Sequence, residues 1–169
     1  MPPRNDFRIA VTKDNLVFAS AHFITFPGHR CEALHGHNYR TRVVVEGGLD
    51  AEAHYVFDFG ELKHLMKELI DEIDHKVLLP LNNPKLQIAM EGDGVSVAYE
   101  REPRYRFPKR DCALLPIPNT TVEMLAQYLA ARLRSALEQR AGSAVQLVAI
   151  EVEVEETFGQ SASYRESFA

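Results

Sequence analysis

The chain has 169 residues, of which 46% are hydrophobic and 25% are charged, the balance of an ordinary globular protein. A net charge of −5 at pH 7 argues against a general binder of nucleic acid or of anionic membranes. The sequence has no apolar run of membrane-spanning length and no signal peptide, and its two cysteines lie far apart. We therefore expect one domain, 1–169, with free thiols in the cytoplasm.

Alternating, strand-forming residues occupy three ranges of the N-terminal part: 7–11, 16–24 and 39–46. A turn-like segment at 13–15 predicts that the first two ranges form either a hairpin or one long, bent strand. Residues 25–34 contain proline and glycine and predict a loop that carries Cys31.

Two amphipathic helices follow. Asp58 with Glu61, and Thr120 with Glu123, have the spacing of a capping box and predict the two helix starts. Apolar residues then recur every three or four positions, in the first helix up to about His75 and in the second until 141–142. The apolar positions are Leu62, Leu65, Met66, Leu69, Ile70, Ile73, Leu125, Leu129, Leu133 and Leu137.

Residues 145–155 and 163–168 predict two last strands, so the element order indicates an α+β domain. The segment 84–116 fits neither helix. Its first part predicts a hairpin that turns at 91–94. From Arg101 to Pro118 the chain is basic and rich in proline, which predicts a loop.

The motif Cys31-x-x-x-His35-Gly36-His37 is the strongest chemical signal. Two histidines at i and i+2 of an extended chain point to the same face, so they can bind one cation together. His22, in a neighbouring predicted strand, is the best candidate for a third ligand. Three imidazoles and an open position are typical of catalytic zinc, whereas the spacing alone equally fits surface or packed histidines.

Several motifs occur in order along the chain: Ser20-Ala21-His22, Cys31 to His37, Val56 to Lys63, Asp74-His75, Thr120 to Glu123, and Glu155-Glu156-Thr157. Through these motifs the chain resembles the 6-pyruvoyltetrahydropterin synthase / 6-carboxytetrahydropterin synthase family, over nearly its whole length apart from the inserted segment 84–116. The resemblance implies a tunnelling fold, in which a four-stranded antiparallel sheet carries two helices on one face. Subunits of that fold join into β-barrel trimers or hexamers, with active sites between subunits.

The family's functional residues match positions of this sequence. The resemblance implies zinc on His22, His35 and His37, and proton transfer by Cys31, Asp74 and His75. Glu156 would anchor the pterin, with Thr121, Glu123 and Thr157 also binding substrate; Glu123 is a helix cap on the alternative interpretation. From sequence alone, Cys31 could equally be an inert buried thiol and Asp74-His75 a simple helix end.

The implied substrate is 7,8-dihydroneopterin triphosphate, and the expected product is 6-carboxy-5,6,7,8-tetrahydropterin of the queuosine pathway. One alternative is 6-pyruvoyltetrahydropterin, for tetrahydrobiopterin. Another is cleavage to 6-hydroxymethyl-dihydropterin for folate, suggested by Glu32 beside Cys31. The remaining alternative is a non-enzymatic scaffold that contains zinc and binds pterin. The basic side chains of 101–110 could contact the triphosphate or form a solvated loop.

Overall fold

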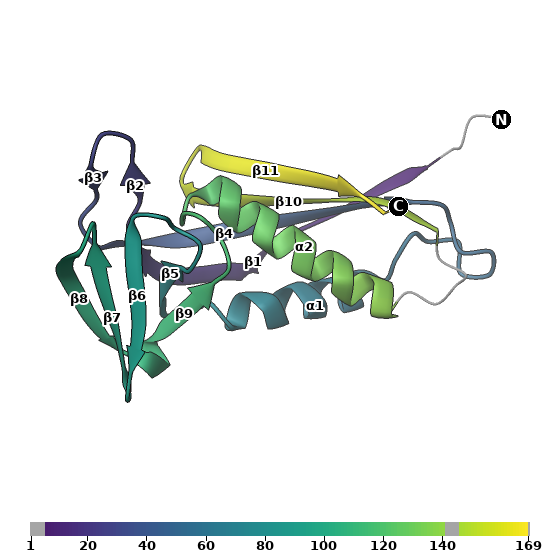
Figure 1. Cartoon of the computed structure of the whole chain (residues 1–169). Helices are drawn as coiled ribbons and strands as arrows, with labels where there is room; N and C mark the ends of the chain where they lie inside the picture. Colours follow the sequence, from purple (N-terminus) through teal and green to yellow (C-terminus); the bar gives the residue numbers. More distant parts are fainter. Residues whose placement is uncertain (1–5, 141–145, 169) are drawn as a thin grey trace.

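The computed structural model describes residues 6–140 and 146–168, and these form an α+β fold, as predicted (Figure 1). The long elements are β1 (Phe7–His22), β4 (His35–Gly47), α1 (Phe59–Asp71), α2 (Val122–Arg140), β10 (Leu147–Thr157) and β11 (Gln160–Ser167). The shorter ones are β2 (Thr25–Phe26), β3 (Arg30–Cys31), β5 (Lys76–Pro80), β6 (Leu86–Glu91), β7 (Gly94–Tyr99), β8 (Glu102–Pro108), a 3-10 turn η1 (Lys109–Asp111) and β9 (Cys112–Leu115). Among these residues, neither helix combines the length and hydrophobicity needed to cross a bilayer.

The main sheet has six strands in the order β11-β10-β4-β1-β5-β9, so the prediction of four strands was incomplete. The four antiparallel strands are present, and β1 is the long, bent alternative, with an irregularity between Thr12 and Val17. The two additional strands, β5 and β9, run parallel to β1 and to each other. Parallel pairing joins segments distant in sequence and leaves no turn signal, so local patterns miss it.

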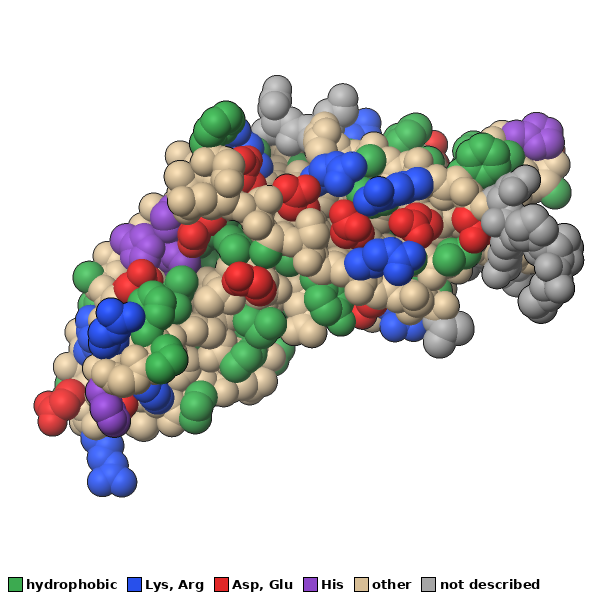
Figure 2. Space-filling view, turned by 90° about the horizontal axis from the view of Figure 1, so that it is seen from above, with side chains coloured by type: hydrophobic (Ala, Val, Ile, Leu, Met, Phe, Trp, Pro, Cys, Tyr) green, Lys and Arg blue, Asp and Glu red, His purple; other side chains and the backbone are tan. Residues whose placement is uncertain are grey.

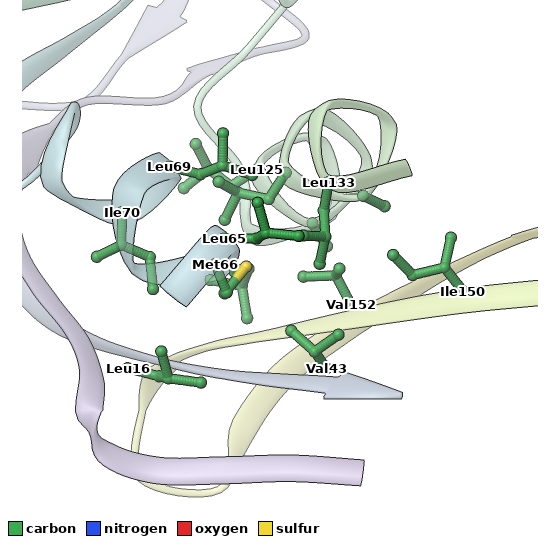
Figure 3. Close-up of a cluster of buried hydrophobic side chains, with 14 of the residues drawn as sticks. Leu16, Val43, Leu65, Met66, Leu69, Ile70, Leu125, Leu133, Ile150 and Val152 are labelled. Carbon is green, nitrogen blue, oxygen red and sulfur yellow. The ribbon is translucent and has the colours of Figure 1, made fainter. Parts of the chain in front are cut away.

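Both helices pack on one face of this sheet and enclose the main core (Figure 3). Leu65 and Met66 of α1 and Leu133 of α2 meet Val43 and Val152 from the strands (Figure 3). Each such fully buried side chain contributes about 2 kcal/mol through removal of apolar surface from water. The predicted apolar stripes of both helices are therefore the buried ones, and this core holds β1 and β4 rigidly beneath the site described below.

Of the two predicted helix starts, the cap of the first is confirmed and the cap of the second is wrong by one residue. Asp58 caps α1 as predicted, accepting a hydrogen bond from the backbone N–H of Glu61 at 2.8 Å. The start of α2 is capped by Thr121 rather than Thr120, because the Thr121 hydroxyl oxygen accepts from the N–H of Met124 at 3.4 Å. The first helix also ends earlier than predicted, at Asp71. The predicted stop at 141–142 and the strand start at 145 lie outside the described residues.

The segment 84–116 forms a second, three-stranded sheet in the order β6-β7-β8. The predicted hairpin is β6 and β7, which turn at 92–93. The prediction of a loop over 101–118 was wrong, because this stretch contains β8, η1 and β9. A second apolar cluster, which includes Phe23, Val95 and Tyr99, packs this sheet against the loop before β4. Figure 1 shows the small sheet at one end of the molecule, beside β2 and β3.

Candidate metal centre and active site

The three predicted histidine ligands come together at the ends of two paired strands. His22 is the last residue of β1 and His35 the first of β4, and the two are direct partners in the antiparallel register. His37 lies one pleat further on, on the same face as His35. One ring nitrogen from each histidine lies within 4.8 Å of the others, and the ring centroids are 4.7–5.2 Å apart.

Hydrogen bonds orient these rings. The Nδ1 of His22 lies 2.8 Å from the carbonyl oxygen of Thr120, and the Nδ1 of His35 lies 3.0 Å from that of Ala33. Because a carbonyl can only accept, each Nδ1 carries the proton and each Nε2 presents a lone pair. Burial lowers the pKa of His22, and this effect is larger than the opposite effect of the hydrogen bond to Thr120. The lowered pKa favours the neutral ring, which is the form that binds a metal.

Glu156 completes the case for a cation. Its Oε1 lies 3.2 Å from the Nε2 of His22 and 3.5 Å from that of His37, in neither case with hydrogen-bond geometry. Both nitrogens are buried and have no hydrogen-bond partner among the described residues. Because the Nδ1 of His22 carries the proton, its Nε2 presents a lone pair to the Glu156 oxygen, and this arrangement is unfavourable without a positive charge between the two atoms. The donor set of three imidazole nitrogens fits zinc, with an open side at the exposed His35.

Two supporting residues were not anticipated from sequence. Thr120 is fully buried; its hydroxyl donates to the carbonyl oxygen of Phe23 at 2.9 Å, so its own carbonyl is held toward His22. Tyr39 lies beneath the cluster, with its ring centroid 5.9 Å from that of His22 and 5.6 Å from that of His37. Burial and the Glu156 and Glu32 carboxylates raise the pKa of Tyr39, so its phenol stays protonated. The alternation of β4 places Tyr39 on the histidine face and was a usable signal.

Cys31 is the last residue of β3, and Glu32 begins the loop between β3 and β4, so the prediction of a loop over 25–34 missed the short strand pair β2–β3. The Cys31 thiol donates to the backbone carbonyl of Glu32 at 3.6 Å, and its side chain packs on the second apolar cluster. Burial raises the pKa of Cys31 and the Glu32 carboxylate adds to this, while the guanidinium of Arg104 acts against both. One oxygen of Glu32 accepts a hydrogen bond from the N–H of Ile24 at 3.1 Å, which fixes this carboxylate against the segment between β1 and β2.

Asp74 and His75 form the predicted pair, with the Nδ1 of His75 2.9 Å from Asp74 Oδ2. The other Asp74 oxygen accepts from the N–H of Ala19 at 2.8 Å. Partial burial acts to raise the pKa of Asp74, but the Ala19 and His75 hydrogen bonds outweigh it and hold the pKa below its ordinary value. His75 has a left-handed φ of 55°, and its N–H donates to the Ala19 carbonyl at 2.7 Å.

The imidazole of His75 is 82% exposed, and it lines a cavity of about 540 Å³ with Ala19, Gly36 and Lys76. The contacts of His75 in the described residues are with Asp74 and Ala19, and those of Cys31 are with Glu32 and the small sheet. Among the described residues, no hydrogen bond or ion pair joins His75 to Cys31. His29 has the same combination of positive φ, exposure and a carboxylate partner, so these features alone do not mark a functional position.

The remaining predicted site residues lie in two places. Thr157 ends β10, and its hydroxyl oxygen is 3.5 Å from the Nδ1 of His37, so it belongs to the histidine cluster. Thr121 caps α2 directly after Thr120, and Glu123 lies in the first turn of that helix. Glu123 is exposed and forms no hydrogen bond or ion pair with the residues described, so the interpretation as a cap was wrong. Figure 2 shows histidine and acidic side chains gathered on the surface toward the small-sheet end.

Comparison with known proteins agrees with this geometry. A sequence model of the 6-pyruvoyl tetrahydropterin synthase family matches residues 10–167. This chain belongs to that family. It is accordingly a lyase-type enzyme, and the scaffold alternative loses its support.

Two relatives of the family carry a more specific name. A protein of Aquifex aeolicus named 6-carboxy-5,6,7,8-tetrahydropterin synthase is 31% identical over 158 residues, which cover 92% of this chain and 90% of the relative. A Methanocaldococcus jannaschii protein, provisionally given the same name, is 37% identical over 150 residues, covering 89% and 90%.

Among solved structures, the 6-pyruvoyltetrahydropterin synthase of Plasmodium vivax superposes with a TM-score of 0.90 at 29% identity, over 98% of this chain and 100% of that one. A second structure of that enzyme, with the same TM-score and 28% identity, is of a variant in which a catalytic glutamate is replaced by alanine. The inserted small sheet therefore lies within the matched part of the chain.

Proposed function

We propose that the chain converts 7,8-dihydroneopterin triphosphate to 6-carboxy-5,6,7,8-tetrahydropterin, with loss of triphosphate and acetaldehyde. The observation that carries the proposal is the convergence of His22, His35 and His37, with the Glu156 oxygen 3.2 Å from the Nε2 of His22 and 3.5 Å from that of His37. The names of the relatives from Aquifex and Methanocaldococcus favour this product over the pyruvoyl one.

In this proposal His22, His35 and His37 hold a zinc ion. When bound, zinc would supply Lewis acidity next to the side-chain oxygens of the substrate, which eases removal of the neighbouring protons. We assign substrate binding beside the cluster to Glu156 and Thr157, which lie at the end of β10. A carboxylate can accept two hydrogen bonds from the donor edge of a pterin, which is the role we assign to Glu156.

Proton transfer is assigned to Cys31, Asp74 and His75. Cys31 as a thiolate would accept a proton from a side-chain carbon of the substrate, and His75 would exchange protons with a side-chain oxygen. Asp74 holds the Nδ1 proton of His75, so the Nε2 of that ring is the atom that is free to accept or donate. Thr121 and Glu123 are proposed to contact the pterin from the start of α2.

We further propose that each active site lies between subunits. His75 is exposed and separate from Cys31 in one chain, so a neighbouring copy is needed to supply it. The main sheet has two edge strands, β11 and β9, and open sheet edges favour pairing with another chain. Joining subunits through these edges would close a β-barrel, as a trimer or as a hexamer of stacked trimers.

The direct test is to incubate the zinc-loaded protein with 7,8-dihydroneopterin triphosphate and to identify the products by mass spectrometry. The proposal expects 6-carboxy-5,6,7,8-tetrahydropterin and acetaldehyde. A 6-pyruvoyl product without acetaldehyde would overturn the assigned product while leaving the substrate. No consumption of substrate by protein with full metal content would overturn both.

Cleavage to 6-hydroxymethyl-dihydropterin is a second candidate, because the structurally similar Plasmodium vivax enzyme has a catalytic glutamate. Glu32 directly follows Cys31, and its carboxylate contributes to raising the pKa of Tyr39 beneath the histidines. If this candidate holds, Glu32→Gln removes the hydroxymethyl product and leaves the carboxy product. Cys31→Ala has the opposite effect. An unchanged product ratio in both variants would exclude it.

A further inference from the structure

The small sheet contacts the Cys31 loop through two consecutive residues of β8. The Nη2 of Arg104 donates to the backbone carbonyl oxygen of Glu32 at 3.0 Å. The hydroxyl oxygen of Tyr105 accepts from the backbone N–H of Leu34 at 3.0 Å. The inserted strand thus holds the loop on both sides of Ala33, immediately ahead of the histidines of β4.

An irregularity in β8 explains how Arg104 and Tyr105, which are adjacent in sequence, both contact the loop that follows Cys31. Tyr105 pairs with Val97 and Pro103 pairs with Ala98, so Arg104 is the extra residue of a β-bulge. In a regular strand Arg104 and Tyr105 would point to opposite faces. A bulge re-aims a side chain, and here both reach the same loop, with the Arg104 guanidinium 5.4 Å from the centre of the Tyr105 ring.

The carbonyl that Arg104 binds is also the partner of the Cys31 thiol. The sulfur lies 3.6 Å from this oxygen and the Nη2 of Arg104 lies 3.0 Å from it, so the positive group is close to the sulfur. The ionisable groups that act on Cys31 are Arg104, Glu32 and, from β7, Tyr99. Of these three side chains, Arg104 carries the positive charge, and it opposes the effect of burial.

We propose that Arg104 is a positioning residue that fixes the Cys31–Glu32 loop and stabilises the thiolate of Cys31. The inserted sheet would then serve the chemistry directly, since it delivers a cation that reduces the rise in pKa caused by burial of the Cys31 thiol. The proposal rests on the proposed function only where Cys31 is said to transfer a proton; the effect on the thiol itself is independent of the substrate.

The test measures the rate of Cys31 alkylation by iodoacetamide against pH, in zinc-loaded protein that carries Cys112→Ser so that one thiol reports. Arg104→Gln should raise the midpoint of this profile by about half a pH unit and slow alkylation near pH 7 about threefold, because an exposed charge acts weakly. Arg104→Lys keeps the charge and should restore most of the midpoint. Arg106→Gln, the same change two residues along β8, is the matched control and should leave the midpoint unchanged.

Each outcome has a distinct meaning. An Arg104→Gln protein with a native circular dichroism spectrum and an unchanged midpoint would overturn the inference, whatever its turnover. An equal shift in Arg106→Gln would also overturn it, because the effect would then be general charge loss. If the midpoint shifts as expected but the parent protein converts no dihydroneopterin triphosphate, the proposed function fails and the Arg104–Cys31 coupling stands.

Discussion

The two halves of the proposed site are built in opposite ways. The histidine cluster is assembled within one chain, and His22 is fully buried and hydrogen-bonded to a buried threonine. The Asp74–His75 pair is held by one strand, but its imidazole projects into solvent with 82% of its side chain exposed. This difference supports the proposal that one chain prepares the metal half and that another copy completes the acid–base half.

The packing gives the physical reason. The antiparallel register of β1 and β4 places His22 opposite His35, and the main core beneath these strands leaves little freedom to separate them. His75, by contrast, lies in the turn between α1 and β5, where Asp74 holds one edge of its ring and the rest of the imidazole faces solvent. The predictions below probe this division, beginning with the largest expected effect.

Removal of one of the three histidines should strongly weaken metal binding. In His35→Ala we expect metal affinity to fall by at least about a hundredfold, because two imidazoles remain where three are needed. Elemental analysis after dialysis measures the bound metal. The control is His64→Ala on α1, which should retain it. Full occupancy in His35→Ala would contradict the assignment of the metal ligands.

Removal of the thiol should separate chemistry from metal binding. In Cys31→Ala we expect turnover to fall by about 10²–10⁴, the usual contribution of a group that transfers protons. The metal content should not change, because the contacts of Cys31 are with Glu32 and the second apolar cluster rather than with the histidines. Metal loss in this variant would show that Cys31 is itself a ligand.

A mixture of two inactive variants tests whether the site is shared between chains. If Cys31 and His75 of one site come from different subunits, reassembly of Cys31→Ala with His75→Ala in equal amounts should restore roughly one quarter of the wild-type activity, from random mixing in a symmetric ring. The assay follows turnover after joint denaturation and refolding, with each variant refolded alone as the control. No recovery in mixed oligomers would place both groups in the same subunit.

The exposed carboxylate of Glu123 should affect binding more than chemistry. In Glu123→Gln we expect KM to rise about tenfold with little change in kcat, because one charge-assisted hydrogen bond to the pterin is lost. Glu138→Gln, on the same helix, is a matched change away from the site and should have no effect. An unchanged KM for Glu123→Gln would remove this residue from the substrate site.

The smallest expected effect is on stability. The pKa of Asp74 is lower in the folded chain than in the unfolded chain. The ionised carboxylate therefore stabilises the fold at pH values above the unfolded-state pKa near 4, and this contribution is lost as the pH falls through the folded-state pKa. Asp74→Asn should therefore lower stability by about 1 kcal/mol at pH 7, and the loss should disappear in acid. Urea unfolding at fixed protein concentration measures this. The control Asp71→Asn, at an exposed helix end, should change stability by less than about 0.5 kcal/mol. A difference for Asp74→Asn that persists at low pH would contradict the assigned pKa.

The sequence by itself determined the parts that local rules specify. The apolar stripes of both helices, the cap at Asp58 and the hairpin of β6 and β7 follow from spacing over a few residues, and all three are observed. The i, i+2 spacing of His35 and His37, with His22 on a neighbouring strand, likewise predicted a three-histidine cluster that the structure contains.

Tertiary structure alone decided the rest. The parallel strands β5 and β9, the carbonyl of Thr120 behind His22, and Glu156 against the histidines depend on pairing between distant segments. The bulge that aims Arg104 at the Cys31 loop depends on strand register. Strand register and long-range pairing are set by the packing of the whole core, so patterns among neighbouring residues of the sequence do not predict them.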